Sequence, residues 1–147
     1  MGTGSCKFMK IKIPKQKSLK KQNDDLWAEI IKRKAGYKSE LSGELGKQAG
    51  GIITLASHHI LGKSNNKLRW SLRNGICLNN YTEHLWGIHN RNDPLKANRI
   101  FNLILIYIGK ERKEYLDLIK VFKGKTDLKL TKIYLKQELK KLIEAEK

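Results

Sequence analysis

The chain reads Leu-Ala-Ser-His-His-Ile at residues 55–60 and Asn-Gly-Ile-Cys-Leu at residues 74–78, and these two stretches decide the fold. Their apolar and β-branched composition predicts a short buried strand over 52–59 and a second over 75–78. A turn rich in Gly and Asn separates them. Helical structure is expected over 81–88, so the predicted order is strand, loop, strand, helix.

All four histidines of the chain lie between residues 58 and 89, as the doublet His58-His59 and the later pair His84 and His89. Imidazole ligates borderline metals and is also a base near neutral pH. Because neighbouring side chains of a strand point to opposite sides, one histidine of the doublet can hold a metal while the other faces a substrate. We therefore assign His58 as a metal ligand and His59 as a general base.

His84 and His89 are predicted to complete the metal site from the helix. Side chains three or four residues apart meet on a regular α-helix, so a spacing of five predicts a frayed or bent last turn. Asn90, Glu83 or water could replace one of the two. A histidine doublet arises by chance often enough, but four clustered histidines in a strongly basic chain favour a metal site.

Asn74 and Arg69 complete the predicted catalytic group with His59. The Asn74 amide could hydrogen-bond across the loop and fix the two strands, or it could hold the His59 ring in position. Arg69 could grip a phosphate bidentately and offset transition-state charge. The alternative for Arg69 is a surface arginine that pairs with an acid.

The chain is strongly basic: 31 Lys and Arg against 14 Asp and Glu give a formal net charge of +17 over 147 residues. This exceeds what solubility needs and predicts a polyanionic partner, most often nucleic acid. A codon bias towards lysine explains the lysine content but less well the scarcity of acids. Phosphodiester hydrolysis needs an activated water and a cation on the developing charge, which one histidine-bound metal and a separate imidazole supply.

One domain with three parts is expected at this length. Residues 1–21 form a basic arm, which is either a strap for the phosphate backbone or a solvated tail. Residues 22–92 hold the site, and residues 93–147 form a helical extension. Apolar stripes at helical spacing predict helices over 24–34, 94–108, 111–122 and 131–144.

Caps and breaks mark the ends of these helices. Asn23 or Asp24 is the expected cap of the first helix, and Thr131 that of the last. Gly109 is expected to end the helix over 94–108.

Targeting and redox signals are weak. Two cysteines do not make a disulfide framework and suit a reducing compartment. No apolar run approaches the roughly 18 to 20 residues of a membrane span, and the N-terminus has no apolar signal region. We expect a cytoplasmic protein of a bacterial or phage-infected cell with no membrane partner.

The words ASHHILGKS, KLRW, RNGICL and HLWGIHNRNDP resemble the HNH (His-Me finger, ββα-metal) endonuclease superfamily, in particular small phage-type HNH nucleases. Residues 55–94 are the specific part of a resemblance that covers most of the chain beyond the arm. It implies an α+β, mostly helical fold with a ββα-metal core, an N-terminal helix and C-terminal helices. It also implies a metal-dependent endonuclease that hydrolyses phosphodiester bonds in DNA with one divalent metal ion, Mg, Mn, Ni or Zn.

The resemblance implies a role for each residue of the cluster. His59 matches the general base, and His58 matches the metal-binding residue before it. Asn74 matches the middle Asn, and His84 the final His, a metal ligand. His89 falls where some members place a further ligand. The interval from Asn74 to His84 is one residue longer than in the family.

The chain departs from the family at its cysteines. Many relatives carry two Cys-x-x-Cys pairs that bind a structural zinc. Ser39 and Ser42 stand at the first pair, and Asn79, Asn80 and Thr82 stand around the second. Serine hydroxyls are poor zinc ligands compared with thiolates, so no structural zinc is expected and the fold must depend on its helices.

Two other functions fit the sequence. The lost cysteines favour a catalytically degenerate nucleic-acid-binding protein on the same scaffold, whereas the retained histidines and Asn74 argue against it. The apolar C-terminal stripes fit a toxin-type protein that docks a regulator, and the same helices could form a homodimer. No helix-turn-helix or zinc-finger spacing occurs, so the basic arm and the Lys-rich helices are expected to contact the phosphate backbone of DNA without reading its sequence.

Overall fold

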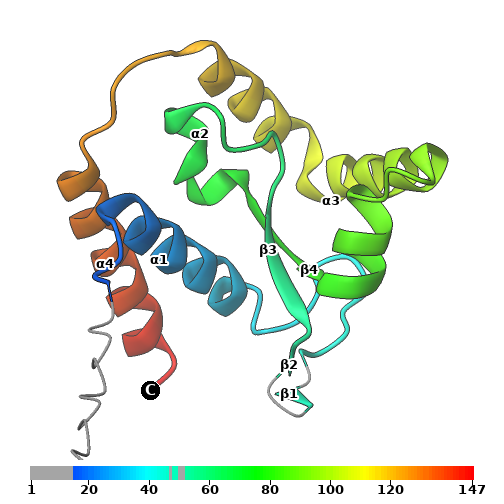
Figure 1. Ribbon diagram of the computed structural model, residues 1–147, viewed down its shortest axis with the longest axis horizontal. Helices are drawn as coiled ribbons and strands as arrows, with labels where there is room; N and C mark the ends of the chain where they lie inside the picture. Colours follow the sequence, from blue (N-terminus) through cyan, green and yellow to red (C-terminus); the bar gives the residue numbers. More distant parts are fainter. Residues whose placement is uncertain (1–14, 47, 50–51) are drawn as a thin grey trace, which may run out of the picture.

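The computed structural model describes residues 15–46, 48–49 and 52–147, and most of them are helical (Figure 1). The elements, in chain order, are α1 (Leu19–Lys34), β1 (Gln48–Ala49), β2 (Ile52–Ile53), β3 (Leu55–His59), α2 (Asn66–Arg69), η1 (Leu72–Asn74), β4 (Gly75–Asn79), η2 (Asn80–Ile88), α3 (Pro94–Val121) and α4 (Leu128–Ala145). Two antiparallel pairs of strands, β1 with β2 and β3 with β4, make up its sheets. The α+β, mostly helical class is therefore as predicted.

Helix α1 begins at Leu19, earlier than predicted. Ser18 caps it by accepting a hydrogen bond from the backbone N–H of Lys21 at 3.3 Å. Asn23, one of the two expected caps, is instead fully buried within the helix and donates to the carbonyl oxygen of Leu128 at 2.9 Å. The last three residues of the predicted basic arm over 1–21 therefore belong to α1, and its first fourteen residues lie outside the described part of the chain.

The predicted strand over 52–59 is divided between the two sheets. Ile52–Ile53 pairs with β1, while β3 pairs with β4 in a register that sets His58 opposite Ile76 and His59 opposite Gly75. A Cβ atom at Gly75 would lie 2.3 Å from Cδ1 of Ile31 in α1. Only glycine therefore allows α1 to approach the start of β4 this closely.

Strand β4 separates two apolar clusters. Cys77 belongs to the cluster in which Trp27 and Ile30 of α1 pack with Leu135 of α4. Its neighbours in the strand belong to the second cluster, which includes Ile76, Leu78, Ile104, Ile108 and Leu116. Alternate residues of a strand face opposite sides, so α1 and α4 cover one side of β4 and α3 covers the other.

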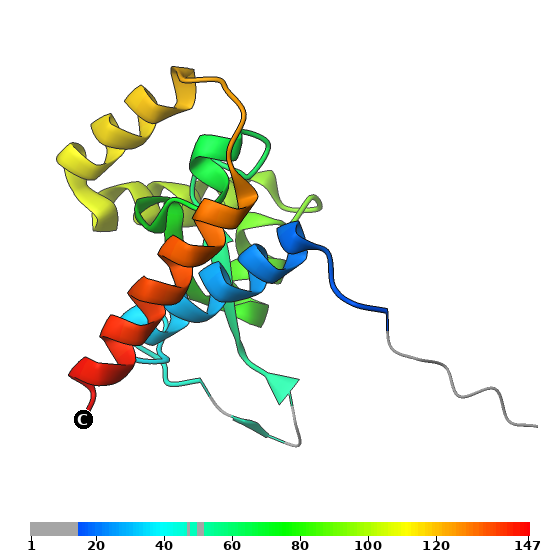
Figure 2. The same ribbon diagram turned by 90° about the vertical axis from the view of Figure 1, so that its left-hand side faces the viewer.

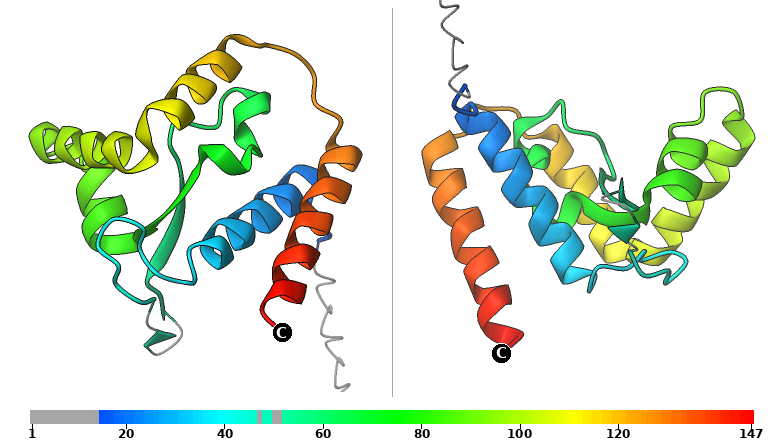
Figure 3. Two further views of the ribbon diagram at one scale, coloured as in Figure 1. Left: turned by 180° about the vertical axis from the view of Figure 1, so that it is seen from behind. Right: turned by 60° about the horizontal axis from the view of Figure 1, so that its bottom comes forward.

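The C-terminal helices are part of the same core. Gly109 interrupts α3 with φ 75° and ψ 171°, as the predicted helix end implied, and the two halves of α3 run in different directions (Figure 3). Helix α4 lies against α1 (Figure 2). It begins at Leu128 with Asp127 as its cap, and Thr131, the expected cap, hydrogen-bonds back to the Asp127 carbonyl. No helix in the described ranges is long and apolar enough to cross a membrane.

Candidate active site

Three of the four histidines form a cluster at the end of β3 beside η2. The ring centroid of His58 lies 5.4 Å from that of His84 and 5.1 Å from that of His89. The His84 and His89 centroids are 4.6 Å apart. Ring nitrogens of all three, one from each, lie within 4.8 Å of one another, so the trio could hold a metal ion, as the sequence predicted.

The π-helical turn of η2 accounts for the spacing of five between His84 and His89. The backbone N–H of His89 donates to the carbonyl of His84 at 3.0 Å, which is the i to i+5 bond of a π-helix. Residues five apart therefore lie on the same side of this element, although they would diverge on an α-helix. The expected frayed α-helical turn was wrong, and a wider regular turn brings both rings inward.

His58 is buried and His84 is half-buried, whereas His89 is exposed, so burial favours the neutral imidazole at the first two. Burial, together with the charges of His84, His89 and His59, lowers the pKa of His58 to about 3. Burial and the neighbouring His89 also lower the pKa of His84. Neutral imidazole is the form that binds metals.

A metal ion also fits the hydrogen bonding of the cluster. Nδ1 of His84 is buried and has no hydrogen-bond partner among the described residues. Buried polar atoms nearly always have a partner, and a bound cation would supply one here. Among the described residues the group has three histidines and no fourth ligand, which is the pattern of a catalytic metal site with an open position and not of a closed structural site.

His59 stands apart from the trio, on the other side of β3. Its ring stacks on the Trp27 ring of α1 with centroids 3.9 Å apart and planes 6° from parallel. Its Nε2 lies 2.9 Å from the carbonyl oxygen of Arg69. Because a carbonyl only accepts, Nε2 carries the proton of the neutral ring and Nδ1 keeps its lone pair. Burial lowers the pKa of His59, although the Arg69 carbonyl opposes this effect.

All four histidines line one hollow of about 500 Å³. The Trp27 ring and two lysines, Lys21 and Lys63, also border it. A second hollow of about 540 Å³, near Tyr115 and Tyr134, contains no histidine. The two hollows differ little in size, so the histidines that line the first one, and not its volume, identify it as the candidate site.

Asn74 is fully buried and holds the loop between the two strands. Its Oδ1 accepts from the N–H of Leu61 at 2.9 Å, and its Nδ2 donates to the carbonyls of Gly62 at 3.0 Å and Leu68 at 3.2 Å. None of these bonds reaches His59. Of the two expected roles, the structure has the bond across the loop, and the Arg69 carbonyl contacts the His59 ring in place of Asn74.

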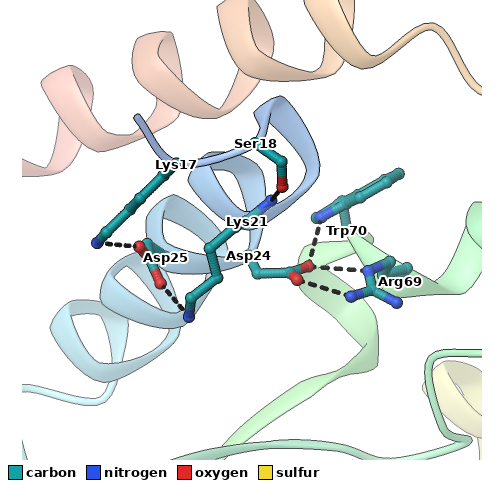
Figure 4. Close-up of polar contacts among 7 residues, drawn as sticks. All are labelled: Lys17, Ser18, Lys21, Asp24, Asp25, Arg69 and Trp70. Carbon is teal, nitrogen blue, oxygen red and sulfur yellow. Dashed lines mark hydrogen bonds and ion pairs between the residues drawn. The ribbon is translucent and has the colours of Figure 1, made fainter. Parts of the chain in front are cut away.

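Arg69 has the alternative role that the sequence left open. Its Nε and Nη2 donate to the two carboxylate oxygens of Asp24 at 2.8 and 2.6 Å (Figure 4). The side chain is 13% exposed and does not border the histidine hollow. The cations that do border it are Lys21, which pairs with Asp25, and Lys63. Lys63 forms no ion pair with any described residue, and its place in the loop just after the doublet was the signal that could have identified it.

Glu83, the suggested alternative ligand, faces away from the metal cluster. Its Oε2 accepts from the Ser39 hydroxyl at 2.6 Å and from the N–H of Asn79 at 2.6 Å. The Ser39 hydroxyl in turn accepts from the N–H groups of Leu41 and Ser42 at 3.2 and 3.1 Å. A buried hydrogen-bond cluster thus joins the 39–44 turn to η2, at the position where the resemblance places a cysteine pair.

Comparison of the chain with protein-family models, with curated proteins and with solved structures gives no match. The function proposed below therefore depends on the geometry and charge of the site.

Proposed function

We propose that the protein is a metal-dependent endonuclease that hydrolyses phosphodiester bonds in DNA. One observation carries the proposal: three histidines that could hold a metal line the same hollow as a separate histidine whose Nδ1 keeps its lone pair. Phosphodiester hydrolysis needs both parts, a cation beside the phosphate and a base for the attacking water.

The division of labour follows from the contacts. Nδ1 of His59 accepts a proton from the attacking water while Nε2–H stays bonded to the Arg69 carbonyl. The oxygen of that water then bonds to phosphorus as the leaving oxygen departs. The stacked Trp27 ring limits the rotation of His59 during this step. His58, His84 and His89 would hold the metal, which when bound supplies the cation that offsets the developing charge.

The charge of the chain supports a nucleic-acid substrate. A net charge of +17 favours a polyanion. Lys63, which forms no ion pair with a described residue, places an ammonium at the hollow, where Arg69 had been expected to act. The order β3, β4, η2 with the histidines at these positions supports a ββα-metal core of the HNH (His-Me finger) kind. The proposed metal is one divalent ion, Mg, Mn, Ni or Zn.

Plasmid cleavage tests the proposal. Wild type and His59→Ala, purified in parallel, are stripped with a chelator and resupplied singly with Mg, Mn, Ni or Zn. We expect metal-dependent nicking by wild type and a rate about 10²- to 10⁴-fold lower for His59→Ala. The affinities for metal and for DNA should be the same for both proteins, because His59 is neither a proposed metal ligand nor a proposed phosphate-binding residue.

Two outcomes would contradict the proposal. Equal cleavage by both proteins would show that His59 is not the base. Retained DNA binding without cleavage by either protein, under every metal, would favour a non-catalytic nucleic-acid-binding protein on the same scaffold. Cleavage of RNA in preference to DNA would correct the substrate class.

A further inference from the structure

One face of α1 binds residues 69–71, the segment whose Arg69 carbonyl contacts His59. Asp24 and Trp27 lie three residues apart and so share that face. Asp24 binds the Arg69 guanidinium through both carboxylate oxygens, and its Oδ1 also accepts from Nε1 of Trp70 at 3.0 Å (Figure 4). Nε1 of Trp27 donates to the carbonyl of Ser71 at 3.0 Å. Three consecutive residues, 69 to 71, are therefore tied to α1.

The first residue of this segment carries the carbonyl that fixes the His59 tautomer. The Arg69 carbonyl oxygen lies 2.9 Å from Nε2 of His59, while the Arg69 side chain is held by Asp24. A carbonyl selects one tautomer only if it stays aimed at the same ring nitrogen. Rotation of the Arg69 peptide would let the proton move to Nδ1, which would then have no lone pair for a water.

We propose that Asp24 is a positioning residue for His59, acting through Arg69. The carboxylate does not contact the imidazole. It holds Arg69 and Trp70 so that the Arg69 carbonyl keeps the proton on Nε2 and leaves Nδ1 free. This inference depends on the proposed function, in which Nδ1 is the base.

The ion pair is not needed to attach α1 to the core. Trp27, Ile30 and Ile31 already bury this helix against β4 and α4. A mostly buried ion pair is weak evidence for stability, because the desolvation of both charges offsets their attraction. Two charge-assisted hydrogen bonds in a fixed fork, however, specify geometry well. The arrangement therefore serves the orientation of residues 69–71 better than it serves overall stability.

The chain offers a matched control at the next residue. Asp25 borders the same hollow and carries the same charge, but it pairs with Lys17 and Lys21, both at 2.7 Å, and does not contact Arg69 (Figure 4). Asp24→Asn and Asp25→Asn remove the same charge from the same surface. Only the first breaks the bidentate pair with Arg69.

The test combines kinetics with direct observation of the tautomer in the full chain. We expect the single-turnover cleavage rate of Asp24→Asn to fall about 10- to 100-fold, with DNA and metal affinity unchanged. Asp25→Asn should cleave at the wild-type rate. Nitrogen NMR of the His59 ring should show the Nε2–H form in wild type and Asp25→Asn, and a mixture of tautomers in Asp24→Asn. Asp24→Glu, which keeps a carboxylate, should recover part of the rate.

A second variant covers the case in which Asp24→Asn does not fold. Arg69→Lys keeps the backbone carbonyl and the charge but loses the fork, so it should show the same mixed tautomer and slower cleavage. Equal rates for the Asp24 and Asp25 variants would overturn the proposal, as would a pure Nε2–H tautomer in Asp24→Asn. If wild type does not cleave, the proposed function fails, and the NMR comparison of the two variants still decides whether Asp24 positions His59.

Discussion

Two polar clusters lie at neighbouring positions of η2, and they differ in whether their buried polar atoms have hydrogen-bond partners. Glu83 faces Ser39 and Asn79, where hydroxyl, carboxylate and backbone N–H groups are paired at short distances. His84, the next residue, belongs to the histidine trio, and its buried Nδ1 has no partner among the described residues. A satisfied cluster stabilises the fold, whereas the unpartnered nitrogen of His84 lies within a group of three histidines that could hold a metal.

The comparison predicts opposite responses to substitution. Removing a member of the Ser39 cluster should destabilise the fold and leave metal binding intact. Removing a member of the histidine trio should abolish metal binding with little loss of stability in the metal-free protein. The following experiments test this difference, beginning with the largest expected effect.

His84→Ala should lower metal affinity by more than about 100-fold, because it removes a direct ligand and even indirect partners change affinity about 10- to 100-fold. A metal at 100 times its Kd should raise the unfolding free energy of wild type by about 2.7 kcal/mol, and that of His84→Ala should not change. Calorimetric titration and thermal melts measure both quantities. Glu83→Gln is the control, and loss of metal binding in that variant would contradict the assignment of the two faces.

Asn74→Ala should lower the unfolding free energy by about 3 kcal/mol, measured by urea denaturation. The substitution leaves the Leu61 N–H and the Gly62 and Leu68 carbonyls without their partner in a buried loop. The exposed Asn66 is the control, and Asn66→Ala should change stability by no more than about 0.5 kcal/mol. Equal stability of the two variants would show that the loop does not depend on this amide.

Ser39→Ala should lower the unfolding free energy by about 2 kcal/mol, because it removes one partner of the buried Glu83 carboxylate and the acceptor for two N–H groups. Metal affinity should stay at the wild-type value. Ser42→Ala is the control, since the Ser42 hydroxyl is exposed and accepts only a long bond of 3.4 Å from the Glu44 N–H. A large loss of metal binding in Ser39→Ala would contradict the comparison, because it would show that the Ser39 cluster contributes to metal binding.

Lys63→Ala should have the smallest effect, a few-fold loss of DNA affinity with a salt-dependence slope about one unit smaller. Its cleavage rate at saturating DNA should fall more than that of Lys140→Ala, which removes an equal charge outside the hollow. Fluorescence anisotropy at several salt concentrations and single-turnover cleavage give the two numbers. Identical behaviour of the two lysine variants would remove Lys63 from the site.

Local patterns in the sequence were sufficient for several features. Alternation along 55–59 placed His58 and His59 on opposite sides of a strand, and the glycine at 109 marked the break in α3. These features depend on backbone periodicity and on one residue's conformational freedom, both of which act over a few residues. The clustering of all four histidines in one window was enough to indicate the metal trio.

Contacts between distant segments were not predictable in the same way. Asp24 was one of two expected helix caps, but it binds Arg69. Trp27 lies in the predicted apolar stripe over 24–34, but it also stacks on His59. Asn74 had two expected roles, and its partners in the loop selected one of them. No periodicity specifies which acid an arginine reaches or which ring a tryptophan covers.

Local sequence patterns were enough for the α+β class, the two strands with the histidine doublet, the broken C-terminal helix and the three histidines that could hold a metal. The tertiary structure alone decided the π-helical turn that brings His84 and His89 together, the carbonyl that sets the His59 tautomer, and the exchange of Arg69 for Lys63 at the hollow. The physical reason is distance along the chain. Strand alternation and glycine conformation are set by neighbouring residues, whereas these contacts form only after α1, β3 and η2 have packed together.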